Sequence, residues 1–410
     1  MKKYFFAIVG LIASYSSTVN AQDIFSIAPI ESVAENVKSD SAEAGIMDFV
    51  LAGEDHDYFA MQFDLYVPEA LDFDHTYFEK GAGIQYTEKR GQRTYMQNID
   101  AVQKTSDMPG FNHFLIVVSP NGTNKVKMLP EVIFTAYFGT TTAGVYPVYI
   151  KNMNLAYGGG ATESTKYPVI TNYVHVGDAS TKGKLDVIGV VAPNVISGVS
   201  SSSVITGLNF AQATTVYGGL NLSNVGITAL PEAGLAVEGT TSYTRNLSTQ
   251  YGTVCVPFAL TSTEETQYYA LSEKTGNKLT FQPVETVPAG TPALVKGNIS
   301  ASVNNATLVA PVSGEMVGTY SNVVPGAVGY FIGQDKFWAL EPTTKVGSYK
   351  AYIPGALGAK SLKIFIEDET GIHEVSSEIS SDDIYNLQGM KLNKTQKGIN
   401  IVGGKKVILK

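Results

Sequence analysis

The sequence predicts an all-β protein: two sandwich-like domains, a short β-rich connector between them and a C-terminal β-hairpin segment. Three observations support this fold class. Apolar and polar residues alternate over short stretches, Gly, Asn and Pro separate these stretches, and no long helical period occurs. The chain of 410 residues, 44% of them apolar, is long enough for two or three domains.

The first 21 residues have the pattern of a secretory signal peptide. Two lysines open the chain, residues 4–13 are apolar, and residues 19–21 offer the small side chains of a cleavage site. An apolar run of this length cannot cross about 30 Å of hydrocarbon, which argues against a membrane anchor. No later stretch is apolar enough for a transmembrane helix. We therefore expect an exported chain that begins at Gln22.

Residues 23–177 are predicted to form an antiparallel sandwich. Residues 59–67 alternate, so that the odd-numbered side chains are apolar and face one way while Gln62 and Asp64 face the other. Pro68 ends this strand because proline has no N–H to donate to a neighbouring strand. The later strands of this domain are expected at residues 111–118, 132–138, 145–150 and 169–176.

Residues 178–231 are predicted to be the connector, because charge nearly vanishes there and apolar residues alternate with Gly, Ser and Asn. The stretch 207–210 (GLNF) returns twelve residues later at 219–222 (GLNL). Such an echo is typical of a β-solenoid, which stacks short strands. Two copies leave two interpretations open: a few solenoid coils, or a connector docked on its neighbours.

Residues 232–375 are predicted to form the second β domain, with a turn at residues 288–292. A polar linker is expected at residues 376–382, and residues 383–410 should form a hairpin around Gly403-Gly404. The strands of the second domain are expected at residues 253–260, 267–271, 293–296, 329–332, 337–340, 351–353 and 362–366.

The last segment carries a motif of strand residues followed by a basic end. Its members are Ile384, Tyr385, Asn386, Gly389, Gly398, Ile401, Val402, Lys405, Val407 and Lys410. On these residues the segment resembles the C-terminal sorting domain of surface proteins that Gram-negative bacteria export by a type IX-like route. The resemblance implies transport across the outer membrane or tethering to the cell surface, rather than a periplasmic location.

Residues 59–73 (FAMQFDLYVPEALDF) resemble a strand and turn of cohesin-like and related carbohydrate-binding sandwiches. Residues 132–138 and 146–155 resemble two later strands of the same family. The resemblance implies a binding domain, since cohesins bind a dockerin protein and relatives bind glycans or space other domains. Residues 251–258 and 289–296 are similar to a β module of multidomain surface proteins, which implies no particular activity.

Composition disfavours several kinds of site. The single cysteine, Cys255, excludes an internal disulfide and every multi-cysteine metal site. It lies in an apolar stretch, so we expect a buried side chain rather than a nucleophile activated by a base. The net charge of −8 disfavours a nucleic-acid partner. Zinc, nucleophile-elbow and phosphate-loop motifs are absent from the sequence.

Two acidic stretches are candidate calcium sites. Asp178, Gly183 and Asp186 match the spacing of a calcium loop, but Lys182 and Gly189 stand where oxygen ligands are needed. We therefore expect a turn at this position. Residues 54–57 (EDHD) offer clustered carboxylates, for which a solvated turn is the simpler interpretation. The histidines show no metal-site spacing and are His56, His75, His113, His175 and His373.

The chain contains 23 tyrosines, including the pair Tyr268-Tyr269. Exposed aromatic rings stack on sugars, so this pair could contact a glycan. The alternative is that tyrosine suits a strand, where it packs its ring and keeps its hydroxyl hydrated.

Taken together, the sequence predicts a non-catalytic, secreted cell-surface protein that binds or adheres through residues 23–177. Its partner would be a glycan or a surface protein, and no catalytic residue, cofactor or metal is assigned. One alternative is a structural spacer or fimbria-like component. Another is a glycoside hydrolase, because a carboxylate pair can come from distant positions of a chain.

Overall fold

The computed structural model describes residues 25–28 and 43–409, apart from residues 52–55, 124, 141, 165–168, 178–179, 192–203, 224, 327, 356–357, 368–372, 376–383, 387–390, 394–396 and 403–404. The expected signal peptide and linker lie outside the described residues. The regular secondary structure of the described residues is β-strands and one 3-10 turn, η1 (Gly158–Gly160), so the all-β prediction is confirmed. Within these ranges, no helix has the length and apolar character needed to cross a bilayer.

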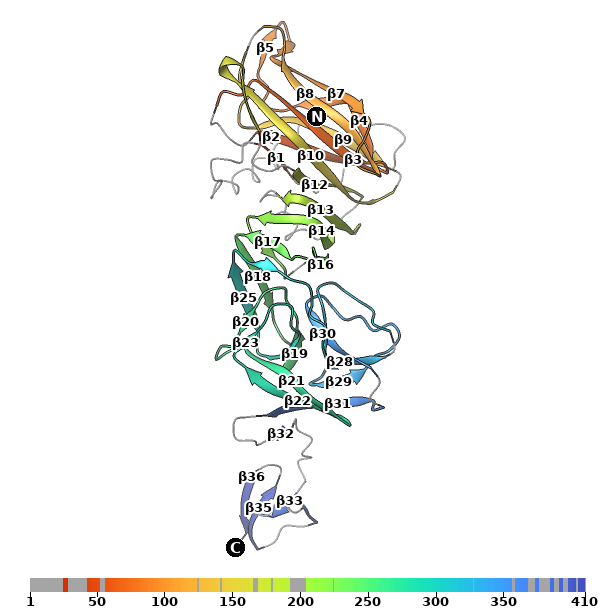
Figure 1. The fold of residues 1–410 in the computed structure, drawn as a ribbon, viewed down its shortest axis with the longest axis vertical. Coiled ribbons are helices and arrows are strands. Elements are labelled where there is room, and N and C mark those ends of the chain that lie inside the picture. Colours follow the sequence, from red (N-terminus) through yellow and green to blue (C-terminus); the bar gives the residue numbers. More distant parts are fainter. Residues whose placement is uncertain are drawn as a thin grey trace.

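Two sheets packed face to face form the N-terminal body, drawn at one end of an elongated molecule (Figure 1). The first sheet has the order β1 (Phe25–Ala28), β2 (Glu43–Leu51), β9 (Val132–Thr140), β4 (Asp72–Lys80). The second has the order β11 (Ala161–Ser164), β10 (Gly144–Tyr157), β3 (Ala60–Pro68), β8 (Phe111–Pro120), β7 (Gln97–Lys104), and β12 (Val169–Val176) also pairs with β10. A separate hairpin joins β5 (Tyr86–Lys89) to β6 (Gln92–Tyr95).

Aromatic side chains from the two sheets meet in the core of this sandwich. The ring of Phe49 on β2 lies 4.4 Å from that of Phe134 and 5.5 Å from that of Phe63 on β3, measured between centroids. The alternation expected in β3 is confirmed, since Phe63 and Leu65 are buried while Gln62 is exposed. The sequence missed β7 and the β5–β6 hairpin, whose side chains are mostly exposed and therefore show little apolar alternation.

The connector forms short parallel strands. Its main strands are β13 (Gly183–Val191), β14 (Ile205–Tyr217), β16 (Gly226–Ala229) and β17 (Leu235–Glu238), paired in parallel and closed by β26 (Thr307–Leu308). A second, smaller sheet contains β15 (Leu220–Asn221), β18 (Thr240–Arg245) and β25 (Ile299–Asn304). Parallel neighbours of this length are the arrangement that a solenoid interpretation requires.

The coil repeat differs from the twelve-residue echo in the sequence. Gly207 pairs with Gly226, and Leu220 pairs with Thr241, so one coil takes about twenty residues. The two copies of the echo therefore lie on two strands of one coil. In successive coils, apolar residues stack on apolar residues and polar on polar. Leu208 lies between Leu185 and Ile227, and the Asn209 side-chain amide donates to Asp186 at 2.9 Å. We call this body the parallel stack.

Residues 251–375 depart from the expected second sandwich and build one ten-stranded sheet that curls. Its order is β19 (Tyr251–Val254), β24 (Ala293–Lys296), β21 (Gln267–Thr275), β22 (Lys278–Val284), β31 (Ser361–Glu367), β29 (Lys336–Ala339), β28 (Gly329–Gly333), β30 (Lys350–Pro354), β27 (Val317–Thr319), and β32 (His373–Val375) also pairs with β31. The curl brings β19 against β30, where the Ala351 amide donates to the Thr253 hydroxyl at 3.0 Å.

The strand expected at residues 253–260 is interrupted, which corrects that prediction. The sheet pairing of β19 ends at Val254, and Pro257 lacks the N–H that a central strand needs. The chain instead crosses over the core, with Cys255 donating its amide to the Tyr349 carbonyl at 3.2 Å. A short pair of strands, β20 (Leu260–Thr261) and β23 (Thr286–Val287), follows.

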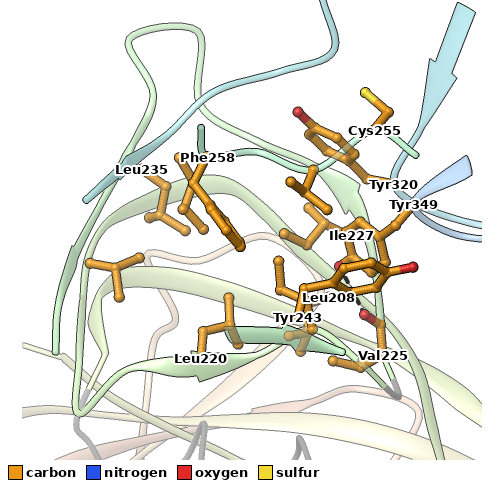
Figure 2. Packing of buried hydrophobic residues seen from close by; sticks show 14 of the residues in the cluster. Leu208, Leu220, Val225, Ile227, Leu235, Tyr243, Cys255, Phe258, Tyr320 and Tyr349 are labelled. Atoms are coloured by element: carbon orange, nitrogen blue, oxygen red, sulfur yellow. Dashed lines mark hydrogen bonds between the residues drawn. The ribbon is translucent and has the colours of Figure 1, made fainter. Parts of the chain in front are cut away.

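The parallel stack and the curled sheet share one hydrophobic core (Figure 2). Leu208, Ile227 and Leu235 come from the stack, while Phe258 and Tyr349 come from the region of the curled sheet. The Tyr349 hydroxyl donates to the carbonyl of Val225 at 2.9 Å, across 124 positions of sequence. This core spans the boundary that the sequence places between residues 231 and 232; the boundary itself stays a prediction.

Strand β12 joins the sandwich to the stack. Every side chain from Ile170 to Val176 is buried, on both faces of the strand. Val174 belongs to the sandwich core, whereas Tyr173 belongs to the core of the stack. The Tyr149 hydroxyl of β10 also donates to the carbonyl of Asp186 in β13, at 3.0 Å. The two bodies are therefore packed together rather than strung on a loop.

The C-terminal segment forms a four-stranded sheet in the order β34 (Lys391–Leu392), β33 (Ile384–Asn386), β35 (Gly398–Val402), β36 (Lys405–Leu409). The expected hairpin is confirmed, since Val402 pairs with Lys405 and Gly398 with Leu409. The motif strand at Ile384 pairs with the second half of the segment, opposite Val402.

Candidate functional site

The most exposed structured feature of the sandwich is the β5–β6 hairpin. Figure 1 shows β5 at the end of the molecule opposite the C-terminus. Its two central residues, Arg90 and Gly91, both have positive φ, of 56° and 76°, as a two-residue type I′ turn requires. Tyr86 and Tyr95 face each other at its base, with ring centroids 5.6 Å apart.

Charge and aromatic rings are combined on this hairpin. The Arg93 guanidinium lies 4.5 Å from the centroid of the Tyr86 ring and 3.6 Å from the Glu88 carboxylate. Lys89, Arg90 and Arg93 outnumber the single acid Glu88, so the hairpin is positive on a chain of net charge −8. Tyr and Arg are the residues enriched at the energetic centres of protein interfaces.

Bonds to the body of the sandwich hold the base of the hairpin. The Met96 amide donates to the Gln85 carbonyl at 2.9 Å, and the Gln85 side chain donates to the Lys127 carbonyl at 2.8 Å. The Gln97 side chain, which is fully buried, donates to the Val126 carbonyl at 2.5 Å. The Lys80 ammonium lies 4.7 Å from the ring of Tyr95. An isolated two-stranded hairpin is only marginally stable, and these contacts fix it as a protruding arm.

A polar cluster lies on the outward face of β3, β8 and β10. Asp64 accepts a bond from the Asn152 side chain at 2.7 Å and contacts the His113 ring at 2.8 Å. Asn152 has a φ of 53° and lies where the pairing of β10 with β3 shifts register, a β-bulge. The other nitrogen of His113 lies 3.2 Å from the Thr105 carbonyl. Both oxygens of Asp64 are thus used within the cluster.

Tyr66 forms the second half of this polar cluster. Its ring stacks on His113 with centroids 4.6 Å apart, the Lys151 ammonium lies 4.4 Å from the ring centre, and its hydroxyl donates to Asp107 at 2.7 Å. Burial is the main cause that raises the pKa of Tyr66, and the bond to Asp107 adds to it. Since the polar groups satisfy one another, this cluster braces the sheet surface rather than presenting a reactive group.

Two carboxylates lie on the outward face of the other sheet, on either side of β9. Asp48 on β2 accepts a bond from the Thr135 hydroxyl, and Glu79 on β4 accepts one from the Tyr137 hydroxyl. Burial raises the pKa of Asp48, with a smaller contribution in the same direction from the charge of Glu79. The glycoside-hydrolase alternative needs two carboxyls at a set separation across a bound sugar, and it stays a prediction.

The acidic loop at residues 54–57 is described only in part, because Glu54 and Asp55 lie outside the described residues. Asp57 pairs with the Lys127 ammonium at 3.0 Å. The His56 ring stacks on Tyr157 with centroids 3.9 Å apart. Over the described ranges of the chain, three or more Asp, Glu, His or Cys side chains do not come together as a possible metal site.

The stretch tested as a calcium loop, for which we expect a turn, is a turn only at Ser180 among its described residues and a strand from Gly183 onward. Asp178 lies outside the described residues, and β13 begins at Gly183 and continues through Asp186 to Gly189. An extended strand cannot wrap its oxygens around one ion, as a calcium loop must. Asp186 instead receives the amide of Asn209 from the next coil.

Cys255 is buried, as the sequence predicts. Its thiol donates to the Gly290 carbonyl at 3.3 Å, and burial raises its pKa to about 12. Tyr268 and Tyr269 are also buried, on opposite faces of β21 and in two different cores. The packing interpretation of this tyrosine pair is therefore confirmed, and a sugar-stacking role for it was wrong.

Sequence reasoning missed the β5–β6 hairpin, although a signal was present. In residues 86–95 (YTEKRGQRTY), Tyr86-Thr87 at one end is mirrored by Thr94-Tyr95 at the other, around the central Arg90-Gly91. Two strands of matching residues that flank a dipeptide ending in Gly indicate a two-residue hairpin even when both faces are polar. An argument based on apolar alternation alone passes over it.

No family model matches the chain, and no curated protein is similar to it. Among solved structures, it is similar to a cohesin module from a family 33 glycoside hydrolase of Clostridium perfringens, with 9% identity and a TM-score of 0.22 over 37% of this chain and 96% of that chain. A non-cellulosomal cohesin from the archaeon Archaeoglobus fulgidus gives 11% identity and a TM-score of 0.24 over 36% and 90% of the two chains.

Proposed function

We propose that the chain is an exported cell-surface protein that binds a partner through its N-terminal sandwich, with the β5–β6 hairpin as the contact surface. The observation that carries the proposal is the hairpin itself. It combines exposed Tyr86, of which 44% is accessible, with Arg90 and Arg93 on a rigidly anchored arm. Building such an arm costs stability, because its side chains bury little apolar surface, so a role in binding accounts for it better than a role in folding.

Binding is tested with the full chain and two matched double variants. Tyr86→Ala with Arg93→Ala removes the aromatic and cationic contacts, whereas Thr87→Ala with Thr94→Ala alters the other face of the same hairpin. A printed panel of glycans and extracellular proteins serves as the probe. We expect at least one probe to bind the wild type and the threonine variant but not the tyrosine–arginine variant. Equal binding of all three proteins to every probe would refute the hairpin as the contact.

The surface location is tested separately, by proteinase accessibility on intact cells. Full-length protein is compared with a version that ends at Ser381 and so lacks the C-terminal sheet. Cleavage of the full-length protein outside, with the truncated protein protected inside, would support a sorting role for the last segment. Protection of both versions would contradict the surface location and favour the periplasm.

A second candidate function is a rigid spacer. The observation that favours it is β12, which is buried on both faces between the sandwich and the parallel stack. A protein whose bodies are joined by packed strands holds its ends at a fixed distance. A spacer without a binding role would leave all probes of the panel unbound while keeping the surface location.

A further inference from the structure

The outward face of the curled sheet carries an aromatic row. Phe337, Leu362 and Ile364 point inward to the core, so the alternate residues of the same strands point outward. Trp338 pairs with Phe331 on one side and with Ser361 on the other. Continuing the pairing of Tyr330 with Ile353 by one residue places Tyr352 opposite Phe331. Trp338, Phe331 and Tyr352 thus lie side by side on β29, β28 and β30.

The indole of Trp338 is held as a platform. Its N–H donates to the Gly333 carbonyl at 2.8 Å, and a Cβ added at Gly333 would lie 3.6 Å from the ring's Cδ1, so this edge of the indole faces Gly333. The hydrogen bond fixes the orientation of the ring, and 44% of the side chain stays accessible. This is the only tryptophan of the chain, and its exposure means that its apolar surface gives the fold little stabilisation.

A row of lysines lies on the same face, on β22, β31 and β29, and meets the aromatic row at β29. Lys278 on β22 is the register partner of Lys363 on β31. The pairing of Phe337 with Leu362, continued by one residue, places Lys336 of β29 opposite Lys363. Three cations therefore follow one another on β22, β31 and β29 at the strand spacing of about 4.8 Å. Only β29 also carries a member of the aromatic row, Trp338, which lies two residues, or about 6.7 Å, from Lys336 along the strand. Like charges opposite one another destabilise a sheet, so folding alone does not favour this row.

We propose that this face binds a carboxylated polysaccharide. Its sugar rings would stack on Trp338, Phe331 and Tyr352, and its carboxylates would pair with the lysine row. A cationic row on a chain of net charge −8 attracts an anionic ligand locally. A linear polymer that crosses the sheet would meet one lysine on each of β22, β31 and β29, and one aromatic ring on each of β29, β28 and β30.

Aromatic rings with cations also suit single-stranded nucleic acid, but two observations favour the polysaccharide. Affinity for a nucleic acid depends on neutralising many phosphates, and this row supplies only three lysines for that purpose. The signal-peptide pattern of the first 21 residues predicts an exported protein, which would meet polysaccharides outside the cell. This site is distinct from the β5–β6 hairpin, so either proposal can fail while the other stands.

Trp338 is a direct reporter for the experiment, because every change in tryptophan emission comes from this face. The full chain is titrated with oligogalacturonate, with the methyl-esterified oligomer as its neutral counterpart, and with oligothymidylate. The double variant Lys278→Gln/Lys363→Gln is compared with a control double variant, Lys182→Gln/Lys184→Gln. The control removes the same charge from exposed positions of the parallel stack. Thermal melting checks that each variant is folded, and calorimetry confirms the affinities.

We expect a saturable change in Trp338 emission with oligogalacturonate that weakens as salt is raised. The variant that lacks Lys278 and Lys363 should bind about tenfold more weakly, while the stack variant should bind within about twofold of the wild type. The absence of both an emission change and a heat of binding would overturn the proposal. Equal binding of the esterified oligomer, tighter binding of oligothymidylate, or an equal loss in the stack variant would overturn it as well.

Discussion

Replacing Leu208 by alanine should destabilise the curled sheet, although Leu208 lies in the parallel stack. The side chain is fully buried between Leu185 and Ile227 of the adjoining coils. It belongs to the core that also contains Tyr268 and Val295, from β21 and β24 of the curled sheet. The opposite faces of these two strands are buried in a separate core inside the curled sheet, which contains Tyr269 of β21. Loss of packing in one core should therefore weaken the other.

The size of the effect follows from burial. Leu→Ala in a well-packed core costs about 3–5 kcal/mol, and a site held between two stacked coils collapses little, so we expect about 4 kcal/mol. With a urea dependence of about 2 kcal/mol per molar, the unfolding midpoint should fall by about 2 M. Trp338, on β29 of the curled sheet, reports the transition through its fluorescence.

Two matched variants make this test decisive. Leu65→Ala removes the same atoms from the sandwich core, and we expect it to shift the Trp338 transition less. Val102→Ala, at a position that is 48% exposed, should leave the transition unchanged. If Leu208→Ala leaves the Trp338 midpoint at the wild-type value, the stack and the curled sheet unfold independently, and the reasoning from the shared core is refuted.

Four smaller predictions concern single groups. Asp48→Asn should raise the thermal midpoint at neutral pH. Burial raises the pKa of Asp48 above its ordinary value of 3.8, so ionising this carboxyl costs stability as the pH rises above 3.8. Calorimetric melts near about pH 3 should therefore show no gain. Cys255, whose pKa burial raises to about 12, should react with a disulfide reagent at about pH 8 roughly a thousandfold more slowly in the native protein than in urea. Gly318→Ala places a methyl group on the Cys255 sulfur and should cost about 1–3 kcal/mol in urea unfolding, most of which a second change, Cys255→Ala, should restore. Asn152→Ala should cost about 1–3 kcal/mol, because it loses the bond to Asp64 at a φ of 53°, and Asn152→Gly should recover the backbone part; equal losses for both would contradict this assignment.

The sandwich strands that bury one face were predictable, because alternation records which side chains enter a core. Residues 59–67 illustrate this, and the observed β3 (Ala60–Pro68) differs from the predicted strand by one residue at each end. Strand β12 shows the limit of the method. Its sequence, VITNYVHV, includes buried Thr171, Asn172 and His175, so polarity no longer marks the solvent side once a strand is covered on both faces.

The parallel pairing of strands in the stack could not be predicted from short sequence patterns, for a different reason. A parallel neighbour lies a whole coil away, and the bonds that align it, such as Asn209 to Asp186, join residues 23 positions apart. The echo between residues 207 and 219 shows which side chains enter the core, but it carries no information on which strands pair. The curl of the second sheet was equally hidden, because its closure depends on contacts such as Thr253 with Ala351, 98 positions apart.

The two proposed binding faces differ in one consequential respect from modules on a flexible linker. Bending between the sandwich and the stack would expose Tyr173 or Val174, which lie on opposite faces of β12 and are about 1% accessible. Bending between the stack and the curled sheet would open the core around Tyr349 and its bond to Val225. The hairpin and the lysine row are thus held at a fixed separation. One face cannot swing on a linker to reach a second binding site after the other face has bound. A polymer long enough to reach both faces would gain affinity over short fragments, whereas fragments that fill one face would bind each site independently.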